Sequence, residues 1–93
     1  MKRIPRQFRV VGHLVKVYVV PPAKWAHADC VAYFDPEKSA IYIKRRSVSL
    51  NRQAFWHEAV HAALSAINHP LYEDEVFVDN LGGLLAQIME SAL

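Results

Sequence analysis

Cysteine is nearly absent from this chain of 93 residues, which contains only Cys30. An internal disulfide therefore cannot form, and a zinc site of the finger type, built on several thiolates, is excluded as well. Any bound metal must be held by nitrogen and oxygen ligands. We interpret Cys30 itself, at the start of a predicted strand, as a small core residue.

Long apolar runs are also missing. The run over residues 10–20 is broken by Gly12, His13 and Lys16, and no stretch approaches the roughly 20 apolar residues of a membrane span. The basic N-terminal residues and this broken run do not form a secretory signal. We therefore expect a soluble cytoplasmic protein with no membrane partner.

A strong excess of one charge is a third feature that the sequence lacks, because the net charge is only +2. Positive side chains cluster near the N-terminus and at residues 44–46, which we interpret as a solvated terminus and a solvated strand edge. No basic motif interleaved with aromatic residues accompanies them, so we do not expect nucleic acid as a partner.

The residues that are present change in character near position 50. Before it, β-branched and aromatic residues dominate in short runs, and after it alanine, leucine and glutamate occur at helical spacing. This order predicts an α+β fold in one domain over residues 1–93, with a small antiparallel or mixed sheet of three to four strands followed by two packed helices. The expected strands span residues 8–11, 14–20, 30–34 and 40–44, with turns at Gly12-His13 and at residues 35–39.

The first helix should run from about residue 52 to residue 67. Asn51 is the expected N-cap, and Leu50 should pack on Phe55 as a hydrophobic staple. Asn68 and Pro70 should end the helix. Its expected apolar stripe consists of Trp56, Val60, Ala63, Leu64 and Ile67.

The second helix should begin near Glu73, where three consecutive acidic residues suit the positive end of the helix dipole. Gly82 and Gly83 lie inside it, although each glycine costs about 1 kcal/mol relative to alanine. A close approach of the first helix, or space left for a ligand, would explain that cost.

Residues 57–61 form an HExxH motif, His57-Glu58-Ala59-Val60-His61, on the first predicted helix. A spacing of four residues places the two imidazoles about 40° apart around the helix axis and one turn apart along it, so both can reach one metal ion. Glu58 shares this flank and can accept a proton from a water that zinc activates, which is how such a site hydrolyses a peptide bond. The alternative is that both histidines are polar boundary residues of an ordinary core helix.

Two histidines leave a catalytic zinc short of a ligand, since such sites use three protein ligands and a water. Leu64 and Ile67 occupy positions where the metzincin pattern requires glycine and histidine, so that continuation fails. If the helices form a hairpin that turns near residue 69, Glu75 and Asp79 face the histidines. Glu75 is the predicted third ligand because its side chain is longer, and the alternative is an ordinary first-turn acid. Asp79 is expected to accept the free N–H of His57.

Residues 75–79, Glu75-Val76-Phe77-Val78-Asp79, match the ExxxD element of the thermolysin-like gluzincins, in which the glutamate is a zinc ligand and the aspartate supports a ligating histidine. The order of strands, HExxH helix and glutamate helix resembles the minigluzincins and the short ImmA/IrrE-type peptidase-like proteins that phages and prophages often carry. The resemblance covers residues 8–90 in outline, and HExxH is its specific part. It implies a bacterial or phage-encoded protein, in which the strand at residues 40–44 borders the cleft and pairs with an extended peptide.

An oxyanion stabiliser is harder to identify, because no residue clearly matches the extra histidine or tyrosine of thermolysin-like enzymes. Tyr72 and His69, in the turn between the helices, are the nearest candidates for that role. The alternative for each is an ordinary turn residue. His13 and His27, on a hairpin and a connection, are expected at solvated positions.

Together these residues predict a zinc metalloendopeptidase that hydrolyses a peptide or protein substrate, with Zn2+ as cofactor and Glu58 as general base. The intact Glu58 favours this hypothesis, since a purely structural site needs no base. The alternative is a catalytically silent zinc-binding domain that acts as a phage-encoded modulator by binding a host protein. Small size favours the alternative, because little surface remains for substrate subsites. The sequence leaves the oligomeric state open.

Overall fold

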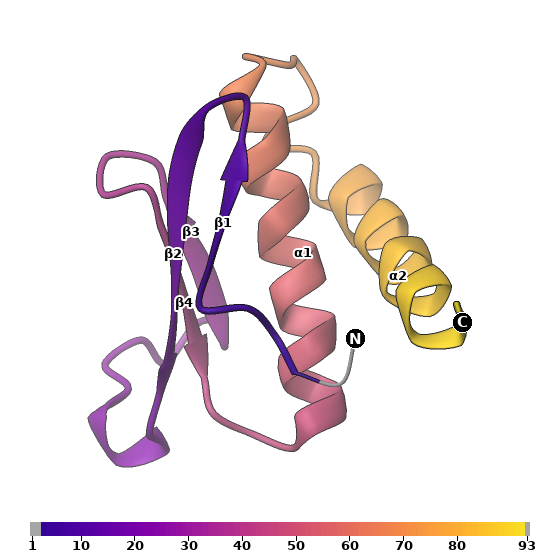
Figure 1. Cartoon of the computed structure of the whole chain (residues 1–93). Coiled ribbons are helices and arrows are strands. Elements are labelled where there is room, and N and C mark those ends of the chain that lie inside the picture. Colours follow the sequence, from indigo (N-terminus) through magenta and orange to yellow (C-terminus); the bar gives the residue numbers. More distant parts are fainter. Residues whose placement is uncertain (1–2, 93) are drawn as a thin grey trace.

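The chain folds as the predicted α+β arrangement, a four-stranded mixed sheet followed by two packed helices (Figure 1). The computed structural model describes residues 3–92, so residues 1, 2 and 93 of the predicted domain lie outside the described residues. The elements are β1 (Gln7–Val10), β2 (His13–Val20), the short 3-10 helix η1 (Pro22–Lys24), β3 (Ala32–Asp35), β4 (Ala40–Lys44), α1 (Val48–Ala66) and α2 (Glu75–Ser91). Within residues 3–92, no helix is long and apolar enough to cross a membrane.

The strand order is β1-β2-β4-β3, with antiparallel β1–β2 and β3–β4 pairs joined by a parallel β2–β4 pair. The expectation that residues 40–44 form the peptide-binding edge is therefore wrong. β4 lies between two strands because Ala40, Ile41 and Ile43 are almost fully buried, which makes it the apolar centre of the sheet. The shorter β3 is the edge strand on this side.

The first hairpin turns one residue earlier than predicted. Val10 pairs with His13, so the two-residue turn is Val11-Gly12 and not Gly12-His13. Val11 and Gly12 have φ angles of 48° and 79°, as a hairpin turn with two left-handed residues requires. A β-branched residue seldom adopts this conformation, and for that reason the sequence pointed to the wrong pair.

The core lies between the sheet and α1, which is covered on its other side by α2 (Figure 1). Figure 1 thus shows three layers, with α1 in the middle. The predicted stripe is correct for Val60 and Leu64 but wrong for Ile67, which is 57% exposed. Because α1 is buried on two sides, its apolar residues do not form one stripe, and the prediction missed Ala54, Phe55 and Ala62 on the sheet side.

α1 begins four residues earlier than predicted. Its N-cap is Ser47, whose hydroxyl accepts a hydrogen bond from the Leu50 backbone N–H at 3.3 Å. The predicted cap Asn51 and its staple are wrong, since Asn51 lies within the first turn and binds the Arg46 backbone instead. The end is as expected, because the helix stops before Asn68, which has a φ of 53°.

α2 begins at Glu75, two residues after the predicted start. The Asp74 carboxylate caps it by accepting a hydrogen bond from the Phe77 backbone N–H at 3.0 Å. Of the two glycines in this helix, only Gly82 faces α1, where a Cβ atom would lie 3.0 Å from the His57 Cα. Close approach therefore explains Gly82, whereas Gly83 has nothing within 4 Å of that position.

Candidate metal centre

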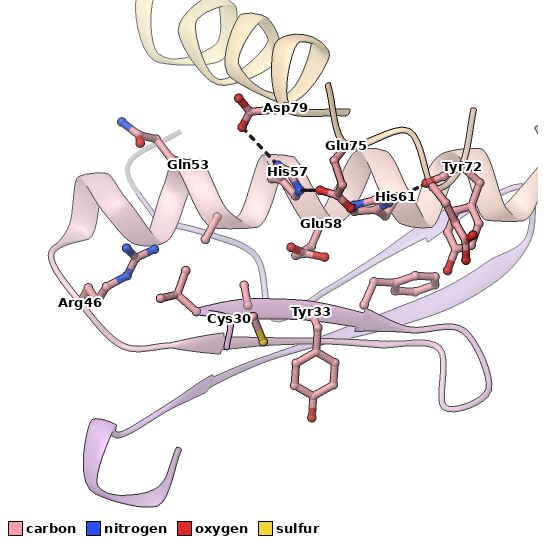
Figure 2. A pocket seen from close by; sticks show the side chains of 15 residues that line it. Cys30, Tyr33, Arg46, Gln53, His57, Glu58, His61, Tyr72, Glu75 and Asp79 are labelled. Carbon is pink, nitrogen blue, oxygen red and sulfur yellow. Dashed lines mark hydrogen bonds and ion pairs between the residues drawn. The ribbon is translucent and has the colours of Figure 1, made fainter. Parts of the chain in front are cut away.

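The structure brings together the three predicted metal ligands. His57 and His61 lie one turn apart on α1, and Glu75 reaches them from the first turn of α2 (Figure 2). The two Glu75 oxygens lie 3.1 Å from His57 Nε2 and 3.0 Å from His61 Nε2. One ligand atom from each of the three residues lies within 4.8 Å of the others, so this cluster can hold a metal ion.

The second nitrogen of each imidazole has its own partner. Asp79 Oδ1 lies 3.5 Å from His57 Nδ1, on the side of the ring that faces away from Glu75 (Figure 2). His61 Nδ1 donates to the backbone carbonyl of Tyr72 at 2.8 Å. Since a carbonyl only accepts, this bond places the ring proton on Nδ1 and leaves Nε2 free as a ligand.

The contact between His61 Nε2 and Glu75 is unusual for this reason. In the neutral ring both atoms carry lone pairs, yet they lie only 3.0 Å apart. Such a contact between two lone pairs is unfavourable, and a cation bound to both atoms would relieve it. The arrangement of donors therefore suits a bound metal ion.

Glu58 lies beside this cluster on the face of α1 that is turned toward β3 (Figure 2). Among residues 3–92, Glu58 is the one charged residue that is buried, with 7% of its surface exposed. Burial raises the pKa of the Glu58 carboxyl, an effect that His57 and His61 oppose. A nearby carboxylate, that of Glu75, raises the same pKa further. The raised pKa makes the Glu58 carboxylate a stronger base, and it lies next to the candidate metal ligands.

A cavity of about 640 Å³ opens in front of these residues. Its lining combines residues 30–34, on and before the edge strand β3, with the inner face of α1 and the start of α2. The free edge of a strand offers unpaired backbone donors and acceptors to an extended chain. The cavity therefore places a strand edge, a buried carboxyl and a possible metal site around one space.

Of the two candidate oxyanion stabilisers, Tyr72 lines the cavity and His69 does not. Tyr72 lines the cavity, with its ring centroid 5.8 Å from that of His61, and burial raises the pKa of its phenol. His69 is not among the residues that line this cavity. Its Nδ1 accepts a hydrogen bond from the Leu71 backbone N–H at 3.0 Å, which stabilises the turn between the helices.

Two features of the site differ from the sequence-based expectations. Cys30, expected in the core, is only partly buried and lines the cavity, where burial and the nearby Asp29 raise the pKa of its thiol. The Tyr72 carbonyl that orients His61 was not predicted, because every residue type has a backbone carbonyl and the sequence does not show which one acts as an acceptor.

Comparison of the chain with protein-family models, with curated proteins and with solved structures found no match. The fold and the site thus define a class only at a general level, a small α+β domain with a His-His-Glu cluster able to hold a metal ion. The resemblance to gluzincins stays a prediction that rests on the HExxH and ExxxD residues.

Proposed function

We propose that this protein is a zinc-dependent metalloendopeptidase acting on a peptide or protein in the cytoplasm. One observation carries the proposal: Glu58, a buried carboxyl of raised pKa, lies beside a His57-His61-Glu75 cluster on the wall of an open cavity. A structural metal site needs no such neighbour, whereas hydrolysis needs a base next to the metal.

The donor set fits zinc better than the common alternatives. Two imidazole nitrogens and one carboxylate oxygen are the ligands of many hydrolytic zinc sites, whereas magnesium and calcium prefer oxygen alone. Bonds of about 2.0 Å place the ligand atoms of a tetrahedral zinc roughly 3.3 Å apart. Each histidine Nε2 lies close to this distance from one Glu75 oxygen, 3.1 Å from Oε2 for His57 and 3.0 Å from Oε1 for His61.

Zinc, when bound, would supply Lewis-acid activation of a water and of the scissile carbonyl. Glu58 would take the proton of the attacking water and pass it to the departing amine. The Tyr72 phenol, which its raised pKa keeps protonated, would donate a hydrogen bond to the developing oxyanion. His69 has no part in this proposal, because its ring is used in the turn.

The substrate would bind as an extended chain along the edge of β3, with backbone hydrogen bonds to Ala32 and Phe34, because the residues that alternate with them turn their backbone groups to β4. This assignment replaces the strand at residues 40–44, whose two edges are already paired. This mode of binding needs little surface on a small domain, since main-chain pairing supplies affinity without deep side-chain pockets.

The test is cleavage of a random peptide library, followed by mass spectrometry. The zinc-loaded wild type should cut the library, and Glu58→Gln should cut at least about 100-fold more slowly, because the amide keeps the shape but cannot accept a proton. Its zinc content should stay unchanged. Glu37→Gln, in the exposed turn between β3 and β4, is the matched control and should retain the wild-type rate.

Activity that survives in Glu58→Gln would assign the base to another residue. A wild type that binds zinc but cuts nothing would instead favour the binding-domain alternative, a phage-encoded modulator that occupies a host protein. The free edge of β3 supports that alternative too, since strand addition needs no chemistry.

A further inference from the structure

Arg46 is a cation that lines the cavity beside the candidate metal ligands, and no group among the described residues neutralises it. It lies in the loop between β4 and α1, and Figure 2 shows its side chain reaching toward the space between α1 and β3. Its Nε is buried and has no hydrogen-bond partner among the described residues. No carboxylate of residues 3–92 forms an ion pair with its guanidinium.

Basic and acidic residues of the cavity lining lie at different positions along α1. Arg46 is the one lysine or arginine among the described residues that line it, and it lies before the N-terminal end of α1. Glu73 and Tyr72, in the segment between α1 and α2, line the opposite end, where Tyr72 lies beside His61 (Figure 2 labels both). Glu58 and the metal ligands lie between these two ends.

The buried Nε of Arg46 has lost its contact with water without gaining a partner, and a carboxylate that forms hydrogen bonds with this half-buried guanidinium would neutralise its charge. We propose that Arg46 determines specificity by binding a carboxylate of the substrate on the N-terminal side of α1. This inference rests on the proposed function, because it assumes that the cavity binds a substrate, but the quantity it concerns is binding alone. The carboxylate belongs either to an acidic side chain or to a free peptide terminus.

The test uses linear monohydroxamates of dicarboxylic acids, from succinic to suberic, each paired with the carboxamide of the same length. The hydroxamate anchors the probe on the zinc-loaded protein, and the chain length that binds best measures the distance to Arg46. Calorimetry should show one length at which the carboxylate binds about tenfold more tightly than its carboxamide, as a hydrogen bond to a charged group allows.

Arg46→Gln should abolish this preference, while acetohydroxamate, which has no carboxylate, should bind both proteins equally. Folding should be unaffected, because Arg46 contacts Asn51 only through its backbone N–H and carbonyl. Glu73→Gln, at the other end of the cavity, is the matched control and should keep the preference. Equal binding of carboxylate and carboxamide at every length, or a preference that persists in Arg46→Gln, would overturn the inference.

The source of the carboxylate is then separated with hydroxamate-capped dipeptides. One carries a glutamate side chain and an amidated end, and the other carries a free carboxyl terminus and no acidic side chain. The source is the group whose binding weakens about tenfold in Arg46→Gln, and insensitivity of both would contradict the proposal. Hydrolysis is not measured in these assays, so they can fail while the peptidase proposal stands, and the reverse is also true.

Discussion

In both histidines of the site, the two ring nitrogens have different partners. Nε2 of both histidines points to Glu75, while the Nδ1 atoms face Asp79 and the Tyr72 carbonyl. Residue spacing predicted Glu75 and Asp79, because helical geometry links sequence separation to a shared face. It did not predict the backbone carbonyl, and the position of Arg46 in the cavity depends on how the β4–α1 loop folds.

Glu75 and Asp79 should differ in their effect on zinc binding. Glu75→Ala removes a proposed ligand and should lose most of the bound zinc, whereas Asp79→Ala should weaken binding by about 10- to 100-fold, as is typical when a histidine loses its orienting carboxylate. Gln87→Ala, exposed on the same helix, is the control and should bind like the wild type. Zinc titrations that reverse the order would make Asp79 the ligand.

At the scale of elements, the site depends on how closely α2 crosses α1. The contact is made at Gly82, whose missing side chain lets α2 approach the backbone of Trp56 and His57. Buried apolar side chains on both helices, Val60, Leu64 and Val78, hold the crossing in place. The position of Glu75 relative to the histidines is thus fixed by packing one to two turns away from it.

The two adjacent glycines allow a matched test of this crossing. Gly82→Ala should lower the melting temperature and weaken zinc binding, since a Cβ at 3.0 Å from the His57 Cα forces the helices apart. Gly83→Ala faces open space and should stabilise the protein by about 1 kcal/mol, the helix propensity difference. Thermal melts and zinc titrations of both variants would contradict the account if Gly82→Ala behaved like Gly83→Ala.

The elements themselves were largely predictable from the sequence, and their boundaries less so. The four strands and two helices were identified because their apolar periodicities differ. The start of α1 was missed because Ser47 and Asn51 are both good caps, and only the fold selects between them. Strand order was also beyond local pattern, since the parallel β2–β4 pair joins segments that are distant in sequence.

At the scale of the whole molecule, a bound zinc would link the outer helix to the rest of the fold. α2 forms the outer layer opposite the sheet, and the proposed ligands come from α1 and α2 (Figure 1). A ligand that binds only the folded state adds to its stability, by about 2.7 kcal/mol when its free concentration is 100 times the dissociation constant. Metal binding and folding should therefore be coupled.

Zinc should raise the melting temperature by more than 10 °C at such an excess, since about 1 kcal/mol shifts a domain of this size by roughly 4 to 8 °C. His61→Ala should lose this shift, whereas His13→Ala, at the exposed start of β2, should keep it. Circular dichroism melts with and without zinc would measure both. A shift of equal size in His61→Ala would mean that zinc binds elsewhere.

We expect His57, His61 and Glu75 to hold one zinc ion next to Glu58. Anomalous diffraction from crystals grown with zinc, measured on both sides of the zinc absorption edge, tests it most directly. The expected result is one strong peak per chain, about 2.0 to 2.2 Å from Nε2 of each histidine and from a Glu75 oxygen. Absence of a peak between these three side chains, or a peak bound only by other residues, would contradict the account.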